Sequence, residues 1–340
     1  MRDRPVLVRA ALTVLSGPFA LAAGVRGALY DRRWLPVRRV GVPVVSVGNL
    51  TAGGTGKTPF VAWLVTAAVA RGRRPAVLSR GYGPRPAGSP LSDEGTLLRE
   101  LLPAGVVQVE DPDRVRGARR LLASPTPPDL VVLDDGFQHR RLHRDLDVVL
   151  LDATDPFGGG HLLPRGLLRE PPRALVRAHV VVLTRAERVP PARVAALRAE
   201  VAALAPRATV AVARTVARAL VGADGAGQPT SRLAGEAVAA WSGIGNPAAF
   251  EALLGDLGAR VVLSVRGRDH HRVAAADLAR VLARAAAAGA GRVVVTRKDL
   301  VKLRPLGPPP HVVALDVVTE VVEGGAELLA RALSLSPTSS

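Results

Sequence analysis

The segment TAGGTGKT, residues 51–58, constrains the fold of this chain more than any other. It follows an apolar, β-branched run at residues 42–50 and leads into a stretch with helical spacing that begins at Lys57. A glycine-rich loop between a buried strand and the start of a helix is typical of phosphate binding, because backbone N–H groups and the positive end of the helix face the anion. Lys57 is expected to reach the β- and γ-phosphates of a nucleotide, and the Thr58 hydroxyl to bind Mg²⁺.

The loop departs from the usual pattern, G-x-x-x-x-G-K-[ST], at its first position, where Thr51 replaces glycine. The remaining glycines still allow a tight backbone whose N–H groups converge on an anion. A glycine-rich turn with a chance lysine is the alternative, and the strand–loop–helix context favours phosphate binding. The predicted nucleotide-binding residues are Thr51, Ala52, Gly53, Gly54, Thr55, Gly56, Lys57 and Thr58.

Two adjacent aspartates are the predicted metal ligands besides Thr58. A phosphate loop needs a carboxylate at the end of a neighbouring strand to organise the metal. Asp134 and Asp135 follow the apolar run LVVL, and either could bind the metal, directly or through water. A buried charge needs a partner, and Mg²⁺ would be that partner. A helix N-cap would explain one aspartate but not two in succession.

Strand-like and helix-like segments alternate along much of the chain. Buried strands are predicted within residues 42–50, 74–83, 128–138, 146–153 and 178–186. This alternation predicts an α/β fold with a P-loop NTPase-like, mostly parallel sheet flanked by helices. Exposed strands are expected within residues 206–220 and lead into a second unit, whose last clear strand falls within residues 291–303.

The N-terminal apolar run, AALTVLSGPFALAAGV, covers residues 10–25. It is shorter than the ~20 residues that a membrane-spanning helix needs, and Gly17 and Pro18 interrupt it. A signal peptide, a helix lying on a membrane beside arginines, and an ordinary buried helix are the three interpretations. A nucleotide-dependent protein belongs where nucleotide is plentiful, so the signal peptide is the least favoured of them.

The formal net charge of +17 favours anionic partners such as nucleic acid, acidic lipid or phosphorylated substrates. A biased, arginine-rich composition is the alternative source of this charge, since only three residues of the chain are lysines. The chain has few aromatic residues and no recognisable nucleic-acid module, so no nucleic acid is expected as a partner. The absence of cysteine excludes disulfides and thiolate metal sites.

Six motifs occur in the order found in the tetraacyldisaccharide 4′-kinase (lipid A 4′-kinase) family, which the chain resembles over residues 28–303. They are VGNLTAGGTGKTP, LSRGYG, DDGFQHRRLHRDLDVVLLDA, LLREP, GIGNP and DHH. The resemblance implies ATP- and Mg²⁺-dependent phosphorylation of the 4′-hydroxyl of a tetraacyl glucosamine disaccharide 1-phosphate in lipid A biosynthesis. It also implies three parts: an N-terminal membrane-associating helix (1–30), a P-loop kinase core (31–208), and linker strands with a smaller C-terminal α/β domain (209–335). A peripheral or monotopic protein at the cytoplasmic face of the inner membrane is implied as well. The alternative is a P-loop ATPase or GTPase switch of the partitioning type, which needs no lipid acceptor.

The resemblance also assigns roles to residues outside the phosphate loop. Asp93 is expected to take the proton of the sugar hydroxyl, with His270 orienting it and Lys57 holding the transferred phosphate. Asp93 and His270 fall in different predicted domains, so domain closure would bring them together. Taken alone, Asp93 would more simply cap a helix beginning near Gly95. Further residues match family site positions: Glu94, Gln138, His139, Arg169 and Glu170.

Three charged residues, Arg169, Glu170 and Arg297, bear on the charge balance of the predicted site. Arg169 is expected to neutralise phosphate charge, and Glu170 to hold Arg169 or the metal. The segment TRKD, Thr296–Asp299, replaces the TEKD of the family, so Arg297 reverses a charge. If this segment contacts nucleotide, Arg297 would change those contacts.

Overall fold

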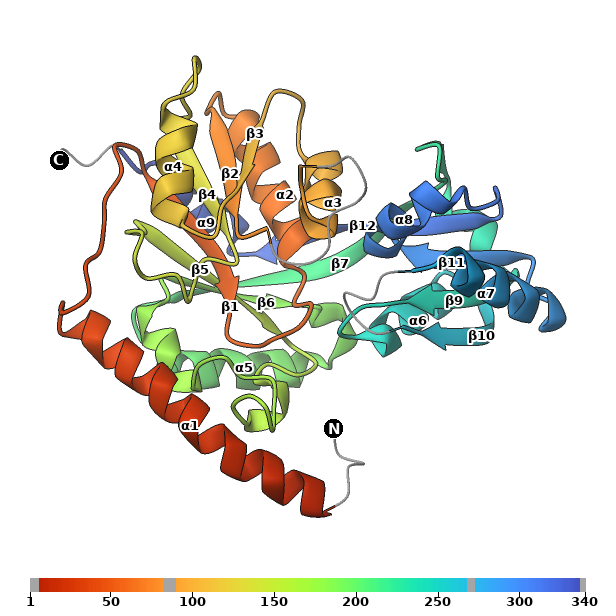
Figure 1. Cartoon of the computed structure of the whole chain (residues 1–340), viewed down its shortest axis with the longest axis horizontal. Coiled ribbons are helices and arrows are strands. Elements are labelled where there is room, and N and C mark those ends of the chain that lie inside the picture. The colour runs from red at the N-terminus through yellow and green to blue at the C-terminus, as the bar shows by residue number, and fades with distance from the viewer. Residues whose placement is uncertain (1–5, 82–89, 268–272, 337–340) are drawn as a thin grey trace. The chain divides into compact units, whose positions relative to one another are not determined.

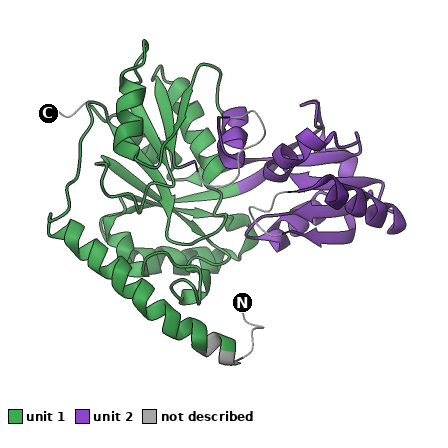
Figure 2. Ribbon diagram, in the orientation of Figure 1, with its two compact units in different colours: residues 1–80, 102–214, 319–340 green, residues 81–101, 215–318 purple. Residues whose placement is uncertain are grey.

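The computed structural model describes residues 6–81, 90–267 and 273–336, and it divides into two compact units (Figure 2). Unit 1 comprises residues 1–80, 102–214 and 319–340, and unit 2 comprises residues 81–101 and 215–318. The division falls within two long strands, β7 (Thr209–Val221) and β12 (Val312–Glu323), so each has one end in each unit.

Unit 1 is built on a parallel sheet in the order β3-β2-β4-β1-β5-β6-β7. Its further strands are β1 (Val44–Asn49), β2 (Pro75–Ser79), β3 (Val107–Glu110), β4 (Leu130–Asp134), β5 (Leu146–Asp152) and β6 (Val180–Thr184). Its helices are α1 (Val6–Asp31), α2 (Lys57–Val69), α4 (Arg114–Leu122), α5 (Pro191–Leu204) and α9 (Gly325–Leu333), with short 3₁₀ turns at Gly158–Gly160, Pro172–Arg177 and Ala186–Arg188.

Hydrophobic burial on both faces explains why these strands are predominantly apolar. Every residue of β1, β2, β5 and β6 is buried. In Figure 1, α5 lies on one face of the sheet and α2 and α9 on the other. The predicted mostly parallel α/β sheet flanked by helices is therefore confirmed. The sequence prediction missed β3, a four-residue strand with only partly buried side chains.

Unit 2 contains a smaller parallel sheet in the order β10-β9-β11-β12. Its strands are β9 (Ala237–Ser242), β10 (Arg260–Arg266) and β11 (Arg292–Thr296), with β8 (Gly227–Gln228) pairing with β7. Its helices are α3 (Asp93–Leu101), α6 (Pro247–Asp256), α7 (Ala275–Ala287) and α8 (Arg297–Leu303), with 3₁₀ turns at Thr230–Leu233 and Arg304–Leu306. The expectation that β11 is the last clear strand is wrong, because β12 follows it and pairs with it.

Residues 81–101, which the sequence analysis counted with the core, belong to unit 2. The reason is local: α3 packs on α8 and is joined to it by ion pairs. The expectation that Asp93 and His270 lie in different domains is therefore wrong in its placement of Asp93. His270 lies outside the described residues.

The N-terminal helix α1 runs without a break through Gly17 and Pro18 and contains 26 residues. The expected interruption is wrong, and at ~1.5 Å per residue the helix is longer than the apolar run suggested. Within the described residues, it contains the one helical stretch, Ala11–Asp31, that is long and apolar enough to cross a membrane. That stretch is not buried inside the protein, which contradicts the interpretation as an ordinary buried helix.

Candidate active site

The phosphate loop joins the buried strand β1 to the start of α2. Gly53 and Gly56 have left-handed φ angles of 133° and 84°, and Gly56 is the N-cap of α2. An added Cβ at Gly53, Gly54 or Gly56 would meet no atom within 4 Å. The loop therefore combines glycine-dependent backbone turns with open space beside them, as a loop that admits phosphate close to its backbone requires.

Thr51, at the position of the missing glycine, is held in a strand-like pairing. It forms an isolated antiparallel bridge with Leu168, and the adjacent Ala52 N–H donates to the Leu167 carbonyl at 2.6 Å. Its φ lies outside the left-handed region, and its side chain is 6% exposed. The backbone at this position therefore does not need glycine, which explains how the loop accommodates threonine.

Asn49, which the sequence analysis did not single out, is the last residue of β1 and binds both the loop and its lysine. Its side-chain N–H₂ donates to the Thr51 carbonyl at 2.7 Å, and its side-chain oxygen accepts from Lys57 Nζ at 3.1 Å. Its backbone carbonyl accepts from Gln138 Nε2 at 3.0 Å. Asn49 is fully buried, so these contacts fix both the loop and the lysine. A polar amide ending a buried strand is the sequence signal that could have identified it.

Asp135 lies between two cations. Arg169 contacts its carboxylate oxygens at 2.9 and 2.7 Å, and Lys57 Nζ lies 3.6 Å from Oδ1. Burial opposes the charged carboxylate, but Lys57 and Arg169 outweigh it and lower the pKa of Asp135. The turn that carries Asp135 has a left-handed φ of 52°, an uncommon conformation for a residue other than glycine. Lys57, Asp135 and Arg169, three predicted site residues, are thus brought together.

The expectation that Glu170 holds Arg169 is wrong. Its carboxylate accepts from Arg177 at 2.5 Å. The Arg177 guanidinium also lies over the ring of the fully buried Phe137, 4.4 Å from its centroid. Glu170 and Arg177 therefore support the turn after β4 from its apolar side, while Arg169 faces Asp135.

His139 follows the same turn and lies in a cationic environment. Burial, followed by the charges of Arg114, Arg26 and Arg144, lowers its pKa to about 4. Among the described residues, its buried Nε2 has no hydrogen-bond partner. Arg114 is itself only 3% exposed, at the start of α4, and no feature of the sequence pattern distinguished it.

The far side of the phosphate loop is fixed by the end of β6. The Thr184 hydroxyl donates to the Thr55 carbonyl at 3.0 Å, and Arg185 donates to the Gly54 carbonyl at 2.8 Å. Arg185 also pairs with Asp152, which ends β5. The Gly54 and Thr55 carbonyls are thus held by side chains from the end of β6, which fixes this side of the loop.

The donor set at this edge of the sheet suits Mg²⁺. Within residues 6–81, 90–267 and 273–336, no group of three or more His, Asp or Glu side chains could hold a metal alone. Mg²⁺ in phosphate sites takes only one or two protein carboxylates, with phosphate and water oxygens completing its shell. The Thr58 hydroxyl and the carboxylates of Asp134 and Asp135 are hard oxygen donors and fit this requirement. Their assignment to the metal stays a prediction.

Asp93 and Glu94 begin α3 in unit 2, and Asp93 is 6% exposed. The alternative that these acids cap a helix beginning near Gly95 is wrong, because α3 starts at Asp93 itself. The capping bond is made by the Ser92 hydroxyl, which accepts from the Gly95 N–H at 3.1 Å. The catalytic assignment of Asp93 stays a prediction.

The chain matches known proteins along almost its whole length. The family model for tetraacyldisaccharide-1-P 4′-kinase matches residues 8–334. A tetraacyldisaccharide 4′-kinase of Anaeromyxobacter dehalogenans is 45% identical over 356 residues, covering 98% of this chain and 93% of the relative. One from Geobacter metallireducens is 40% identical over 326 residues, covering 90% and 91%.

A solved structure shares the fold. The crystal structure of LpxK from Aquifex aeolicus in complex with ATP aligns with a TM-score of 0.71 and 29% identity. The alignment covers 95% of this chain and 98% of that one. With the phosphate loop and its surroundings, these matches show that the chain belongs to the tetraacyldisaccharide-1-P 4′-kinase family.

Proposed function

We propose that the chain transfers the γ-phosphoryl group of ATP to the 4′-hydroxyl of a tetraacyl glucosamine disaccharide 1-phosphate. The observation that carries this proposal is the phosphate loop, whose lysine is fixed between Asn49 and Asp135, in a member of this kinase family. The alternative of a P-loop switch protein without a lipid acceptor has no comparable support, because the family match covers residues 8–334.

The residues of unit 1 would bind and neutralise the triphosphate. Phosphoryl transfer depends mainly on positioning and on offsetting the charge of the transferred group. Two positively charged side chains, Lys57 and Arg169, lie together at Asp135 and would offset the charge of the triphosphate. The N–H groups of the loop would add hydrogen bonds to its oxygens. Mg²⁺, held by Thr58 with Asp134 or Asp135, would supply further neutralisation when bound.

Asp93 is the proposed general base. The 4′-hydroxyl oxygen forms a bond to the γ-phosphorus, the bond from that phosphorus to the departing ADP oxygen breaks, and the hydroxyl proton passes to the Asp93 carboxylate. His270, outside the described residues, is proposed to orient Asp93. Glu94, Gln138 and His139 are proposed to support the substrate or these groups. A base in this role typically contributes ~10²–10⁴-fold to the rate.

The test is ATP-dependent phosphate transfer to the tetraacyl disaccharide 1-phosphate, followed by mass spectrometry and kinetics. Lys57→Ala should nearly abolish transfer, and Asp93→Asn should lower kcat by ~10²–10⁴-fold with little change in KM for ATP. Asp277→Asn is the matched control, because Asp277 is also a first-turn aspartate of a helix in unit 2. An unchanged kcat in Asp93→Asn would remove Asp93 from the mechanism, and ATP hydrolysis without lipid phosphorylation would contradict the function itself.

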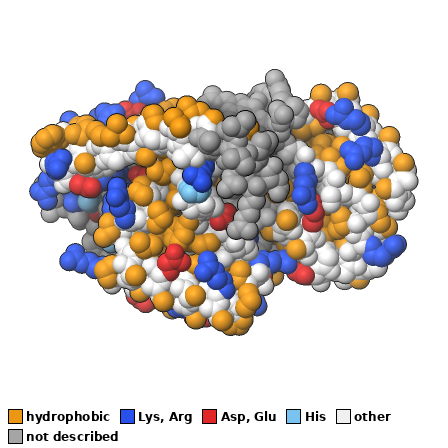
Figure 3. All heavy atoms as spheres, turned by 90° about the horizontal axis from the view of Figure 1, so that it is seen from below, with side chains coloured by type: hydrophobic (Ala, Val, Ile, Leu, Met, Phe, Trp, Pro, Cys, Tyr) orange, Lys and Arg blue, Asp and Glu red, His pale blue; other side chains and the backbone are white. Residues whose placement is uncertain are grey.

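We also propose that α1 binds the cytoplasmic face of the inner membrane, where a lipid substrate is accessible. Val14, Leu15 and Leu21 are 75%, 58% and 69% exposed on this helix. Figure 3 shows hydrophobic side chains gathered along the edge where α1 runs. At the end of the helix, Trp34 is 71% exposed and Arg32 lies 5.8 Å from its ring. Apolar burial next to arginines is typical of a segment at a membrane surface.

A cavity beside α1 supports a lipid substrate. Its volume is about 370 Å³, and most of its lining is apolar. Its lining includes Ser16, Ala20, Leu162, Arg165, Leu168 and Pro171. Leu168 is the residue that pairs with Thr51 of the phosphate loop, so the cavity adjoins the segment that supports the loop. An acyl chain is the substrate part that such a lining would accept.

A further inference from the structure

The segment Thr296–Asp299 has no part in the function proposed above, although it carries the charge reversal at Arg297. It forms the junction between β11 and α8. The buried Asp299 carboxylate accepts from the Thr296 hydroxyl at 2.7 Å and from the Gly243 N–H at 2.9 Å. The junction is therefore rigidly tied to the loop after β9 as well as to its own helix.

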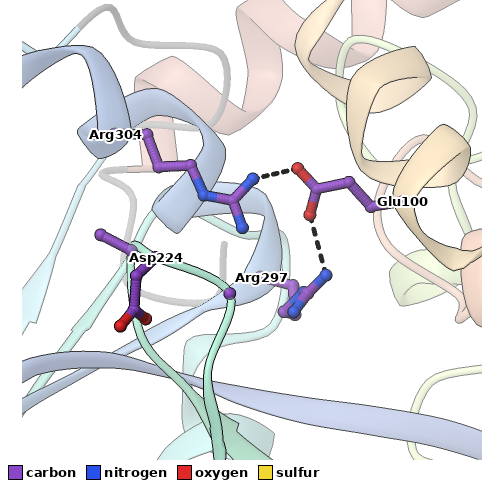
Figure 4. Close-up of a pocket in the computed structure, with 6 residues that line it drawn as sticks. Glu100, Asp224, Arg297 and Arg304 are labelled. Atoms are coloured by element: carbon purple, nitrogen blue, oxygen red, sulfur yellow. Dashed lines mark hydrogen bonds and ion pairs between the residues drawn. The ribbon is translucent and has the colours of Figure 1, made fainter.

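The same junction holds α3 at both ends. Lys298 Nζ contacts Glu94 at 2.7 Å, near the start of α3. Arg297 contacts Glu100 at 2.8 Å near its end, and Arg304 donates to the other oxygen of Glu100. Figure 4 shows Glu100 between the two arginines, at the edge of a pocket of about 410 Å³. One carboxylate therefore pairs with both arginines.

Arg297 also reaches into the core of unit 2. Its Nε lies 3.9 Å from Oδ1 of Asp316, which is 1% exposed and also paired with Arg218. The Arg297 side chain is thus placed between two carboxylates. A glutamate at this position would face Glu100 and Asp316 and would be repelled by both. In this chain the surroundings therefore favour arginine over glutamate.

We propose that Arg297 and Lys298 are positioning residues that fix α3 and, through it, the Asp93 carboxylate. The inference rests on the proposed role of Asp93 as the base. α3 has nine residues, and an isolated helix of that length is marginal in water, so its position depends on its contacts. Asp93 is the first residue of α3 and Glu94, which Lys298 binds, is the next. A small displacement of a reacting group can cost up to ~10²-fold in rate.

The test is a series of substitutions at Arg297 with kinetics on the ATP and lipid substrates. We expect kcat to fall in the order Arg, Lys, Ala, Glu, with Arg297→Ala about tenfold below the parent and KM for ATP unchanged. Arg297→Lys should recover most of the loss because it restores the charge. Glu100→Gln combined with Arg297→Ala should lower kcat by less than the product of the two single effects, since the two side chains share one contact.

Arg292→Ala is the matched control. Arg292 pairs with Glu236 in the same unit, and the two side chains are 15% and 24% exposed, against 14% and 23% for Arg297 and Glu100. Both arginines should give similar shifts of the unfolding midpoint, but only Arg297→Ala should lower kcat. Equal kinetic effects at the two sites, or a raised KM for ATP as the sole effect, would overturn the positioning role.

Asp93→Asn separates this inference from the proposed function. If Asp93→Asn lowers kcat strongly while the Arg297 series follows Arg292→Ala, the positioning role fails and the base remains. If Asp93→Asn leaves kcat unchanged, the base fails and the positioning role fails with it.

Discussion

Among single residues, His139 shows most clearly how the surroundings of a side chain set its charge. Burial and the nearby Arg114 lower its pKa to about 4, well below the ~6.5 of an unfolded chain. Between these values, an unfolded histidine takes up a proton that the folded protein resists. The neutral His139 side chain therefore makes its full contribution to the free energy of unfolding above pH 6.5. This contribution is lost as the pH falls toward 4.

His139→Gln should accordingly reduce the acid sensitivity of folding. Urea unfolding of the parent and the variant at pH 7 and pH 5 gives the difference that matters, because His143 and His179 also have lowered pKa values and contribute equally to both proteins. We expect a smaller loss of unfolding free energy between the two pH values in the variant. Identical losses would show that His139 does not titrate in this range.

Residue types and spacing identified the chemical groups of the site, but not every partner. Lys57, Asp135 and Arg169 come together as charged groups around a phosphate site should. Consecutive residues in an extended segment point to opposite sides, so the pattern LLREP could not tell whether Arg169 or Glu170 would face inward. The bond from the Arg169 N–H to the Leu50 carbonyl sets that choice, and it exists only in the folded chain.

Among the elements, the contact between β1 and the turn after β4 leaves no room for a side chain at Gly48. A Cβ there would lie 2.6 Å from the Phe137 Cβ and 2.7 Å from its backbone N. Gly48→Ala should therefore lower the free energy of unfolding by about 3 kcal/mol, the upper end of usual overpacking costs. It should also weaken ATP binding, because β1 leads into the phosphate loop and Phe137 follows the turn that carries Asp135.

Gly41→Ala is the control for this substitution. Gly41 lies before β1 in the same unit, and an added Cβ there would meet no atom within 4 Å. In both urea unfolding and KM for ATP, Gly41→Ala should stay close to the parent. If Gly48→Ala matched it in both measurements, the close approach of the turn to β1 would be contradicted.

The elements that sequence patterns predicted well are those with one dominant signal. β1, β4, β5 and β6 are apolar, β-branched and buried, so burial alone defines them. β12 is long, and its second half is largely exposed, with Glu320 and Glu323 interrupting the apolar pattern. In α1, Gly17 and Pro18 resemble a break, but the helix continues through them. Helix propensity alone overestimates how strongly these two residues interrupt a helix, because the neighbouring turns keep the backbone helical.

For the whole molecule, the fold class followed from strand–helix alternation, whereas the division into units did not. The alternation specifies a parallel sheet with flanking helices. Whether α3 belongs to one unit or the other depends on ion pairs between residues about 200 positions apart in the chain, such as Lys298 with Glu94. Sequence spacing carries no information on such a pairing.

The expectation that nucleic acid is not a partner stays a prediction.

The net charge of +17 and the exposed apolar residues of α1 should contribute separately to membrane binding. Attraction to anionic lipid is screened over about 3 Å at 1 M salt, whereas apolar burial persists there. In vesicle co-sedimentation at 0.1 M salt we therefore expect stronger binding to anionic than to neutral vesicles. Raising the salt to 1 M should remove this preference but leave part of the binding. Deleting residues 1–26 should abolish that remaining part, and equal binding of both proteins at 1 M salt would contradict the role of α1.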